Sequence, residues 1–179
     1  MMPSHAGPSP NDAPAVAQGA SGAADFRAAM RELAAGVTII TAGREHGRRG
    51  LTATAVCSVS AEPPTLLVCV NRSAEGHAAI TESGSFCVNV IAAEHLPLAE
   101  RFAGRDGARG AERFAQGEWG ALATGAPVLA DAIAAFDCQL LQAIDAGTHT
   151  VFLGAVTATT VSPQRAALLY RAGAFAATG

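Results

Sequence analysis

Two long runs of residues typical of β-strands, Ala132–Ile144 and Thr148–Val161, follow one another in the C-terminal third of the chain. The three residues between them, Asp145-Ala146-Gly147, have the chemistry of a hairpin turn, because Asp and Gly favour tight backbone turns. Strands joined by so short a turn pair antiparallel. The pair therefore favours an antiparallel sheet over a parallel sheet built from βαβ units.

Further β-type runs precede this hairpin. Val37–Ala42 and Leu51–Ser60 flank a charged, glycine-punctuated turn, so we expect them to form a second hairpin. Thr65–Val70 is apolar on both faces, which predicts a central position in the sheet. Ser85–Ile91 forms another strand, and a final short strand is expected from Leu168–Tyr170 and Ala174–Phe175.

Three short helices are expected between these strands. The first begins after Asp25, which can act as its N-cap, and ends at Gly36, with one face formed by Phe26, Met30 and Leu33. The other two span Ala74–Ser83, ended by Gly84, and Glu94–Phe102, with Pro97 in its first turn. Because strands outnumber helices, the chain is predicted to be mainly β with peripheral helices packed outside an antiparallel barrel.

The 179 residues suit one domain, which we place at 25–179. Residues 1–24 are rich in Pro, Gly, Ser and Ala and show no apolar periodicity, so they are predicted to be a disordered tail. The tail has no basic segment followed by an apolar one, so it does not resemble a secretory signal. A cytoplasmic protein is therefore expected.

Composition excludes several classes of partner and site. A formal net charge of −3 gives no basic surplus for nucleic acid or anionic lipid. The apolar runs are much shorter than the roughly 20 residues of a membrane helix.

No glycine-rich dinucleotide or phosphate loop is present. The five His residues lack metal-ligand spacing, so no metal is expected, and His77 and His95 are assigned to the surface. The four cysteines lie in predicted strands and are expected to be core residues: Cys57, Cys69, Cys87 and Cys138.

The strand Leu51–Ser60 carries short hydroxyl side chains at alternating positions. Thr52, Thr54, Ser58 and Ser60 would share one face of a regular strand. Such a face could let a planar ligand lie close to the main chain and bond to the hydroxyls. A solvent-facing Thr/Ser strand is the alternative, and the residues alone favour it.

The next strand ends in Cys69-Val-Asn-Arg-Ser73, where polar groups follow a buried run. Arg72 offers a charged fork and Ser73 a hydroxyl donor, which together suit a phosphate. This signal, too, is weak when taken alone.

Taken together, an ordered series of segments resembles a known family. The series opens with Phe26-Arg-Ala-Ala-Met-Arg31 and Ala35-Gly-Val-Thr38, and it includes the Leu51–Ser60 strand, Pro63-Pro64 and Cys69–Ser73. It continues through Phe86-Cys-Val-Asn-Val90, Arg101-Phe-Ala-Gly104, Arg113-Phe114, Trp119 and Gly147-Thr-His-Thr-Val-Phe-Leu-Gly154. From about Phe26 to Phe175, the chain resembles the small flavin reductase component of two-component flavin-dependent monooxygenases.

The resemblance implies an FMN-binding split β-barrel, six-stranded and homodimeric. It implies that NADH or NADPH reduces FMN or FAD, and that the reduced flavin passes to a separate flavin-dependent oxygenase or halogenase. It leaves open which flavin, which nicotinamide nucleotide and which partner are used. A non-catalytic flavin- or haem-binding split-barrel protein is the alternative. A pyridoxamine-phosphate oxidase-like enzyme shares the barrel, but its basic phosphate cluster has no match here.

The resemblance also assigns site residues. It places the flavin ring and ribityl chain along one segment of small residues: Thr52, Ala53, Thr54, Ala55, Val56, Cys57, Ser58 and Ser60. Ser58, Arg72 and Ser73 would lie towards the phosphate, with Asn71 also among the cofactor-binding residues, and Asn89 would help to close the site. His149 and Tyr170 would approach the nicotinamide. His149 is assigned the catalytic position, as a hydrogen-bond partner of the nicotinamide nucleotide.

The chain departs from the family near its end. After Phe175 it continues Ala-Ala-Thr-Gly, where many relatives keep a polar or His residue. This difference affects how the second nucleotide would be held.

Overall fold

The computed structural model describes residues 22–162 and 165–178. The predicted tail, residues 1–24, lies outside the described residues except for its last three. Two of these three, Ala23 and Ala24, begin helix α1 (Ala23–Met30), so regular structure starts slightly earlier than predicted.

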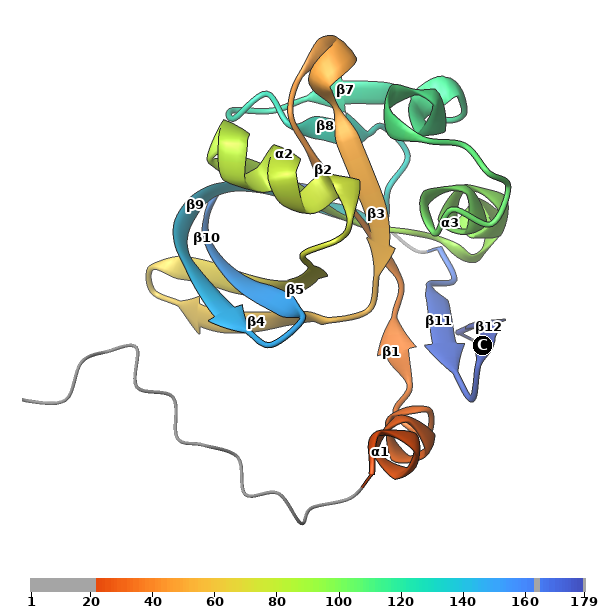
Figure 1. Ribbon diagram of the computed structural model, residues 1–179. Coiled ribbons are helices and arrows are strands. Elements are labelled where there is room, and N and C mark those ends of the chain that lie inside the picture. Colours follow the sequence, from red (N-terminus) through yellow and green to blue (C-terminus); the bar gives the residue numbers. More distant parts are fainter. Residues whose placement is uncertain (1–21, 163–164, 179) are drawn as a thin grey trace, which may run out of the picture.

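A seven-stranded sheet dominates the molecule, and all of its neighbouring strands pair antiparallel. Its order is β3-β2-β6-β9-β10-β5-β4. In chain order, its strands are β2 (Thr38–Ala42), β3 (Arg49–Ala53), β4 (Val56–Ala61), β5 (Pro64–Asn71), β6 (Ser85–Val90), β9 (Ala134–Ala146) and β10 (His149–Val161). The predicted mainly β fold is confirmed, and Figure 1 shows how strongly the sheet curls.

The two edge strands, β3 and β4, are separated by only Thr54 and Ala55. Three residue steps from Ala53 to Val56 can span at most about 11 Å. The opposite edges of the sheet must therefore approach each other, and no strand pairing joins them among the described residues. The sheet is thus a barrel that is split between β3 and β4.

Two expectations about the segment 51–60 are wrong: it is not a single strand, and its side chains do not alternate regularly along its whole length. We predicted one strand, but β3 pairs with β2, whereas β4 pairs with β5 at the other edge. A register irregularity between Ser58 and Ser60 further disturbs the alternation. The barrel accordingly has seven strands rather than six, because the single predicted strand contributes two.

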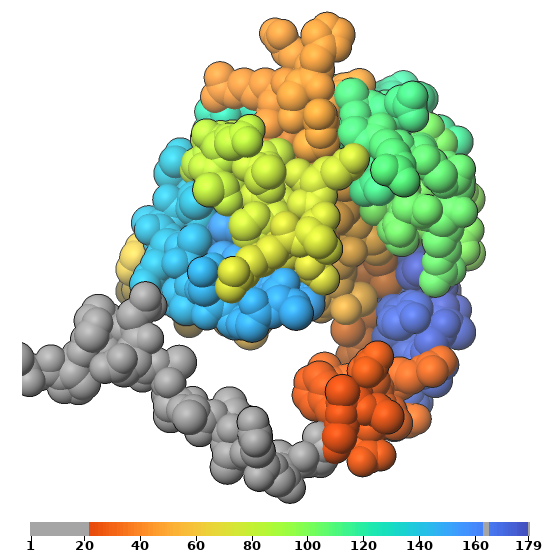
Figure 2. All heavy atoms as spheres, viewed as in Figure 1, coloured from red at the N-terminus to blue at the C-terminus, as the bar shows by residue number. Residues whose placement is uncertain are grey.

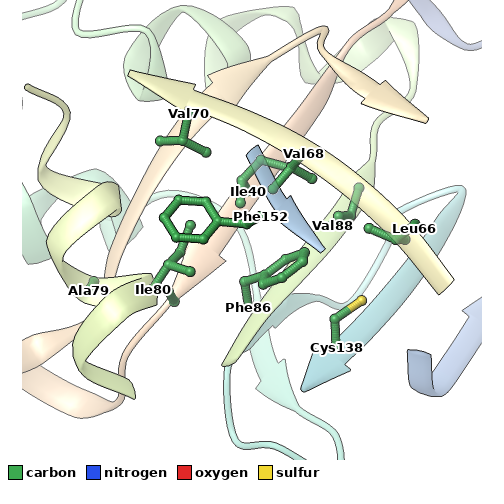
Figure 3. Close-up of a cluster of buried hydrophobic side chains, with 11 residues drawn as sticks. Ile40, Leu66, Val68, Val70, Ala79, Ile80, Phe86, Val88, Cys138 and Phe152 are labelled. Carbon is green, nitrogen blue, oxygen red and sulfur yellow. The ribbon is translucent and has the colours of Figure 1, made fainter. Parts of the chain in front are cut away.

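The interior of the barrel is a cluster of aliphatic and aromatic side chains contributed by most strands and by α2 (Glu75–Ser83). Figure 3 shows Phe86 and Phe152 among the side chains that fill it, together with Ile40, Val68 and Ile80. Strand β5 has β10 on one side and the edge strand β4 on the other, so it is an interior strand but does not lie at the predicted central position. Its inner residues are Leu66, Val68 and Val70, all buried, whereas Leu67 and Cys69 are half-buried.

Close packing also explains Gly154 of β10. A Cβ atom at this position would lie 2.6 Å from Cζ of Phe86, so a side chain there would collide with the core.

Helix α2 crosses the curled sheet on one side (Figure 1) and ends, as predicted, at Gly84, whose φ of 64° lies in the left-handed region. Helix α3 (Leu96–Phe102) has Pro97 in its first turn, as predicted, and follows a 3-10 turn, η2 (Ala93–His95). Within residues 22–162 and 165–178, no helix is long and apolar enough to cross a membrane.

Helix α1 differs from its prediction. It has Gly22, not Asp25, as its N-cap, and it ends at Met30, well before Gly36, which lies in strand β1 (Ala35–Gly36). None of its residues is buried.

Smaller elements surround the barrel. Strand β1 joins β11 (Leu168–Arg171) and β12 (Ala174–Ala177) in a three-stranded sheet. The expected single last strand is two strands, because Ala172 and Gly173 both have positive φ and form a tight turn. The remaining elements are the 3-10 turns η1 (Glu45–Gly47) and η3 (Gly110–Ala115), and the hairpin of β7 (Trp119–Ala121) with β8 (Pro127–Leu129).

The cysteine prediction is confirmed for two of the four residues. Cys87 and Cys138 are buried, and burial followed by the nearby Asp137 carboxylate raises the pKa of Cys138 to about 12. Cys69 is half-buried and Cys57 is exposed, because Cys57 lies on an edge strand.

Neither of the two helix-associated histidines is a plain surface residue. The His95 side chain is 11% exposed, and its Nε2 lies 2.9 Å from Oδ2 of Asp131. His77 is half-buried, and its ring centroid lies 5.1 Å from that of Phe152.

A chain of hydrogen bonds ties the β9–β10 hairpin to α2. The Thr150 hydroxyl donates to Oδ1 of Asp145 at 3.2 Å and lies 2.9 Å from Nε2 of His77. Because a hydroxyl carries one proton, His77 must be the donor in the second bond. Thr150 is only 2% exposed and His77 is half-buried, so the bond between them is largely shielded from water, whereas Asp145 is exposed.

We therefore predict that Thr150→Val lowers the free energy of unfolding by about 1–3 kcal/mol, since it leaves the His77 donor without its partner. Urea denaturation should show a lower midpoint with an unchanged slope. Thr160→Val at an exposed position of the same strand is the matched control, and equal midpoints for the two variants would contradict the prediction.

Candidate functional site

A cleft of about 430 Å³ opens beside the N-terminal end of α2. Leu51 and Thr52 of β3 line it together with Phe102 at the end of α3. One wall is the segment 73–75, and the other is the loop 104–113, from which Gly104, Gly107, Ala108, Arg109 and Arg113 line the cleft. In Figure 2 the yellow-green atoms of α2 and the green atoms of this loop stand on either side of a recess.

The first wall follows directly from the end of β5. The Asn71 side-chain oxygen accepts hydrogen bonds from the Ser73 backbone N–H at 2.9 Å and from the Ser73 hydroxyl at 2.8 Å. This turn leads into α2, whose N-cap, Ala74, provides no side-chain cap. Uncapped N–H groups and the helix dipole favour an anion at such a helix start.

Arg113 shapes the second wall. Its guanidinium donates to the carbonyl oxygens of Gly50 at 2.9 Å, Phe102 at 3.1 Å and Ala108 at 3.0 Å. Because its three partners are all backbone carbonyl oxygens, Arg113 fixes the loop against β3 and α3.

A second arginine, Arg101, braces the same loop. It donates to Oδ2 of Asp106 at 2.5 Å and to the carbonyl oxygen of Glu112 at 2.8 Å. The Ala108 N–H, and then Arg101, lower the pKa of Asp106, so its carboxylate stays charged and keeps the loop in place.

Arg109 is different from both. It lines the cleft, is exposed, and its side chain has no hydrogen bond or ion pair within the described part of the chain. A free guanidinium facing an uncapped helix start and the Ser73 hydroxyl suits a phosphate or carboxylate group.

The predicted flavin-lining segment passes three separate hollows because it spans both sheet edges. Thr52 lines the cleft, with its hydroxyl donating to the Ala99 carbonyl oxygen at 2.5 Å. Thr54 and Ala55 line a second hollow of about 700 Å³ beside α1 and Tyr170. Val56, Ser58 and Ser60 line a third hollow of about 230 Å³, and Ala53 and Cys57 line none of these three.

The residues expected near the phosphate are likewise separated. Ser73 lines the cleft, and Asn71 orients it. Arg72 does not line the cleft, and its guanidinium lies 3.6 Å from Oδ2 of Asp145 instead.

Asn89 lies in the core. It is fully buried, donates to the Ile39 carbonyl oxygen at 3.1 Å and accepts from the Leu129 N–H at 2.8 Å. Because these bonds are structural and the side chain is inaccessible, we leave Asn89 out of the site.

The two residues expected at the nicotinamide side lie on different sheets. His149 is exposed at the start of β10, with its Nδ1 2.9 Å from the Thr148 hydroxyl, and it pairs across the sheet with Asn71. Tyr170 is in β11, where it pairs with Ala35 and packs against Phe175. His149 is thus placed beside the first wall of the cleft, whereas Tyr170 faces the second hollow.

The sequence reading missed Arg109, Arg113, Glu75 and Phe102. Phe102 and Arg113 belong to segments that carry the family resemblance, but no role was assigned to them, and nothing local showed that the Arg- and Gly-rich segment 104–120 would fold back onto β3 and α2. Within the described ranges, no group of three or more His, Cys, Asp or Glu residues could hold a metal ion.

Comparison with known proteins agrees with this architecture. Residues 30–179 match the family described as flavin reductase like domain. The chain is 47% identical over 146 residues to an FMN reductase (NADH) RutF of Agrobacterium fabrum, covering 82% of this chain and 83% of that protein. It is 50% identical over 147 residues to the RutF protein of Variovorax paradoxus, covering 82% and 81%.

The chain is also similar to solved structures of flavin reductases. BorF, the flavin reductase component of a bacterial two-component tryptophan halogenase, superposes with a TM-score of 0.80 at 36% identity, covering 87% of this chain and 98% of that one. The NADH:FAD oxidoreductase SgcE6 of Streptomyces globisporus, solved with NAD and FAD fragments, gives 0.79 at 32% identity, covering 87% and 92%.

Proposed function

The chain belongs to the flavin reductase-like family, and we propose that it is an enzyme that uses NADH to reduce FMN. We further propose that the reduced flavin is released to a separate flavin-dependent oxygenase or halogenase, by analogy with BorF, the reductase component of a two-component halogenase. The cytoplasmic location expected from the sequence is part of the same proposal. The observation that carries it is the cleft, in which a free cation and a helix start lie close to Leu51 and Thr52 of β3.

The residues of the cleft fit a flavin mononucleotide. Its phosphate matches the free Arg109 guanidinium and the start of α2, and the Ser73 hydroxyl would donate to it in place of its bond to the Asn71 side-chain oxygen. Its planar ring would extend from Thr52 in the cleft to Thr54 and Ala55, which line the second hollow and whose short side chains let a ligand approach the backbone closely. Bound FMN would supply the hydride acceptor at its N5, opposite C4 of the nicotinamide.

The protein therefore needs no nucleophile or metal, because the two nucleotides carry the chemistry. Its task is to hold the rings in contact and in the correct orientation. In this proposal Arg109 and Ser73 hold the flavin phosphate, and His149 forms a hydrogen bond to the nicotinamide nucleotide. Backbone N–H groups of the 52–60 segment are candidates to stabilise charge that develops on the flavin.

The direct test mixes the purified protein with NADH and added FMN and follows the nicotinamide absorbance. Turnover that depends on added FMN supports the proposal. A yellow protein without turnover would indicate the non-catalytic flavin-binding alternative. Repeating the assay with FAD and with NADPH settles which nucleotides are preferred.

We also propose a homodimer. Helix α1 exposes Phe26 by 60% and Met30 by 48%, and β9 exposes Leu141 by 59%. Apolar side chains this exposed favour a covering partner, and a second copy would bring its own surface to the outer hollows. Light scattering should give twice the 18.0 kDa chain mass, and an active species at the mass of a single chain would contradict the dimer.

Arg109→Ala should weaken FMN binding by about 1–2 kcal/mol, a roughly fivefold to thirtyfold rise in Kd, because an exposed charged contact to the phosphate is lost. Binding of riboflavin, which lacks the phosphate, should not change. Arg72→Ala is the matched control, since Arg72 is paired with Asp145 and does not line the cleft. Equal losses for FMN and riboflavin, or no loss for either, would refute the assignment; fluorescence quenching measures both.

His149→Ala should raise the KM for NADH about threefold to tenfold, the effect of losing one neutral hydrogen bond of about 0.5–1.5 kcal/mol. The FMN Kd should stay constant, because the flavin contacts lie elsewhere. His46→Ala, at an exposed histidine in η1, serves as the control. An unchanged KM in a His149→Ala protein of normal stability would show that this histidine does not bind the nucleotide.

A further inference from the structure

One hydrogen bond joins the two walls of the cleft. The backbone N–H of Gly110 donates to Oε2 of Glu75 at 2.9 Å. Glu75 is in the first turn of α2, and Gly110 is the first residue of η3. In Figure 2, yellow atoms from the start of α2 reach the green atoms of the loop at this edge of the recess.

The bridge lies beside the groups proposed to hold the phosphate. Arg109 directly precedes Gly110 on one wall, and Ser73 lies two residues before Glu75 on the other. The φ of Gly110 is +52°, in the left-handed region that favours glycine. The bridge therefore connects the two walls next to Arg109 and Ser73.

A carboxylate on the wall of an anion-binding cleft is electrostatically unfavourable for the anion. The Glu75 carboxylate next to Arg109 therefore has a role other than binding the anion, and its hydrogen bond to Gly110 indicates that role. Glu75 holds the loop against the start of α2.

We propose that the Glu75–Gly110 bridge closes the phosphate end of the cleft and makes the enzyme select FMN over FAD. The inference rests on the proposed function, in which the flavin phosphate lies at Arg109. The phosphate of FMN is the end of the molecule, so a closed cleft can hold it. In FAD the chain continues through a second phosphate to adenosine, and this extension has to pass the bridge.

The test measures Kd for FMN and for FAD by flavin fluorescence quenching, which does not depend on turnover. The wild-type chain should bind FMN more tightly than FAD. Glu75→Ala removes the bridge and should lower this preference about threefold to tenfold, mainly through tighter FAD binding, since one hydrogen bond no longer has to open. General destabilisation of α2 would weaken both flavins and leave their ratio unchanged.

Two further variants separate closure from charge. Glu75→Gln keeps an oxygen that accepts from Gly110 but removes the negative charge, so it should retain the wild-type preference. Glu82→Ala removes a carboxylate from a distant turn of the same helix and should also retain it. Wild-type protein without FMN preference, an unchanged ratio in Glu75→Ala, or a Glu75→Gln variant that behaves like Glu75→Ala would each overturn the proposal.

A different result would contradict the proposed reductase activity. If NADH is not consumed with either flavin, the reductase activity is absent, while the ratio of the two Kd values still decides whether the bridge selects FMN.

Discussion

The short connection through Thr54 and Ala55 determines the shape of this molecule. It joins β3 and β4, which are the opposite edges of a seven-stranded sheet, so the sheet has to curl until its edges nearly meet. The hydrophobic interior fills this curl, and α2 covers one side of it. Because the edges do not pair, small side chains and backbone remain accessible along the split, where hollows open on both sides of the connection.

The charges around the cleft divide into those that build it and those that are free. Arg113 and Arg101 donate hydrogen bonds to backbone carbonyl oxygens and to Asp106, and so they fix the loop that forms one wall. Arg109, on the same loop, is left facing the cleft. A fixed loop that presents one unpaired cation is preorganised, since no further chain ordering is needed when an anion binds. The reductase proposal therefore depends as much on the bracing arginines as on the contacting one.

Local signals were sufficient for much of the fold. The residues 145–147 predicted the β9–β10 hairpin, although its turn is Gly147-Thr148 because Asp145 and Ala146 continue β9, and Gly84 predicted the end of α2. The division of 51–60 was not predictable in this way, because its β-type pattern continues through Thr54 and Ala55, and only the choice of partner strands breaks it. The same holds for the arginines: Arg72 is paired with Asp145 from another hairpin, whereas Arg109 lines the cleft because its loop folds back onto β3 and α2. The family resemblance identified the class, but the residues that hold the anion required the tertiary structure.

In the proposed complex the flavin lies in the cleft beside β3, with its phosphate between α2 and the 104–113 loop. A crystal structure of the protein with FMN would test this placement. We expect the phosphate within hydrogen-bond distance of Arg109 and Ser73, and the ring against the segment from Thr52 to Ala55. An FMN molecule whose phosphate lies at Arg72, or in the hollow beside Tyr170, would contradict it.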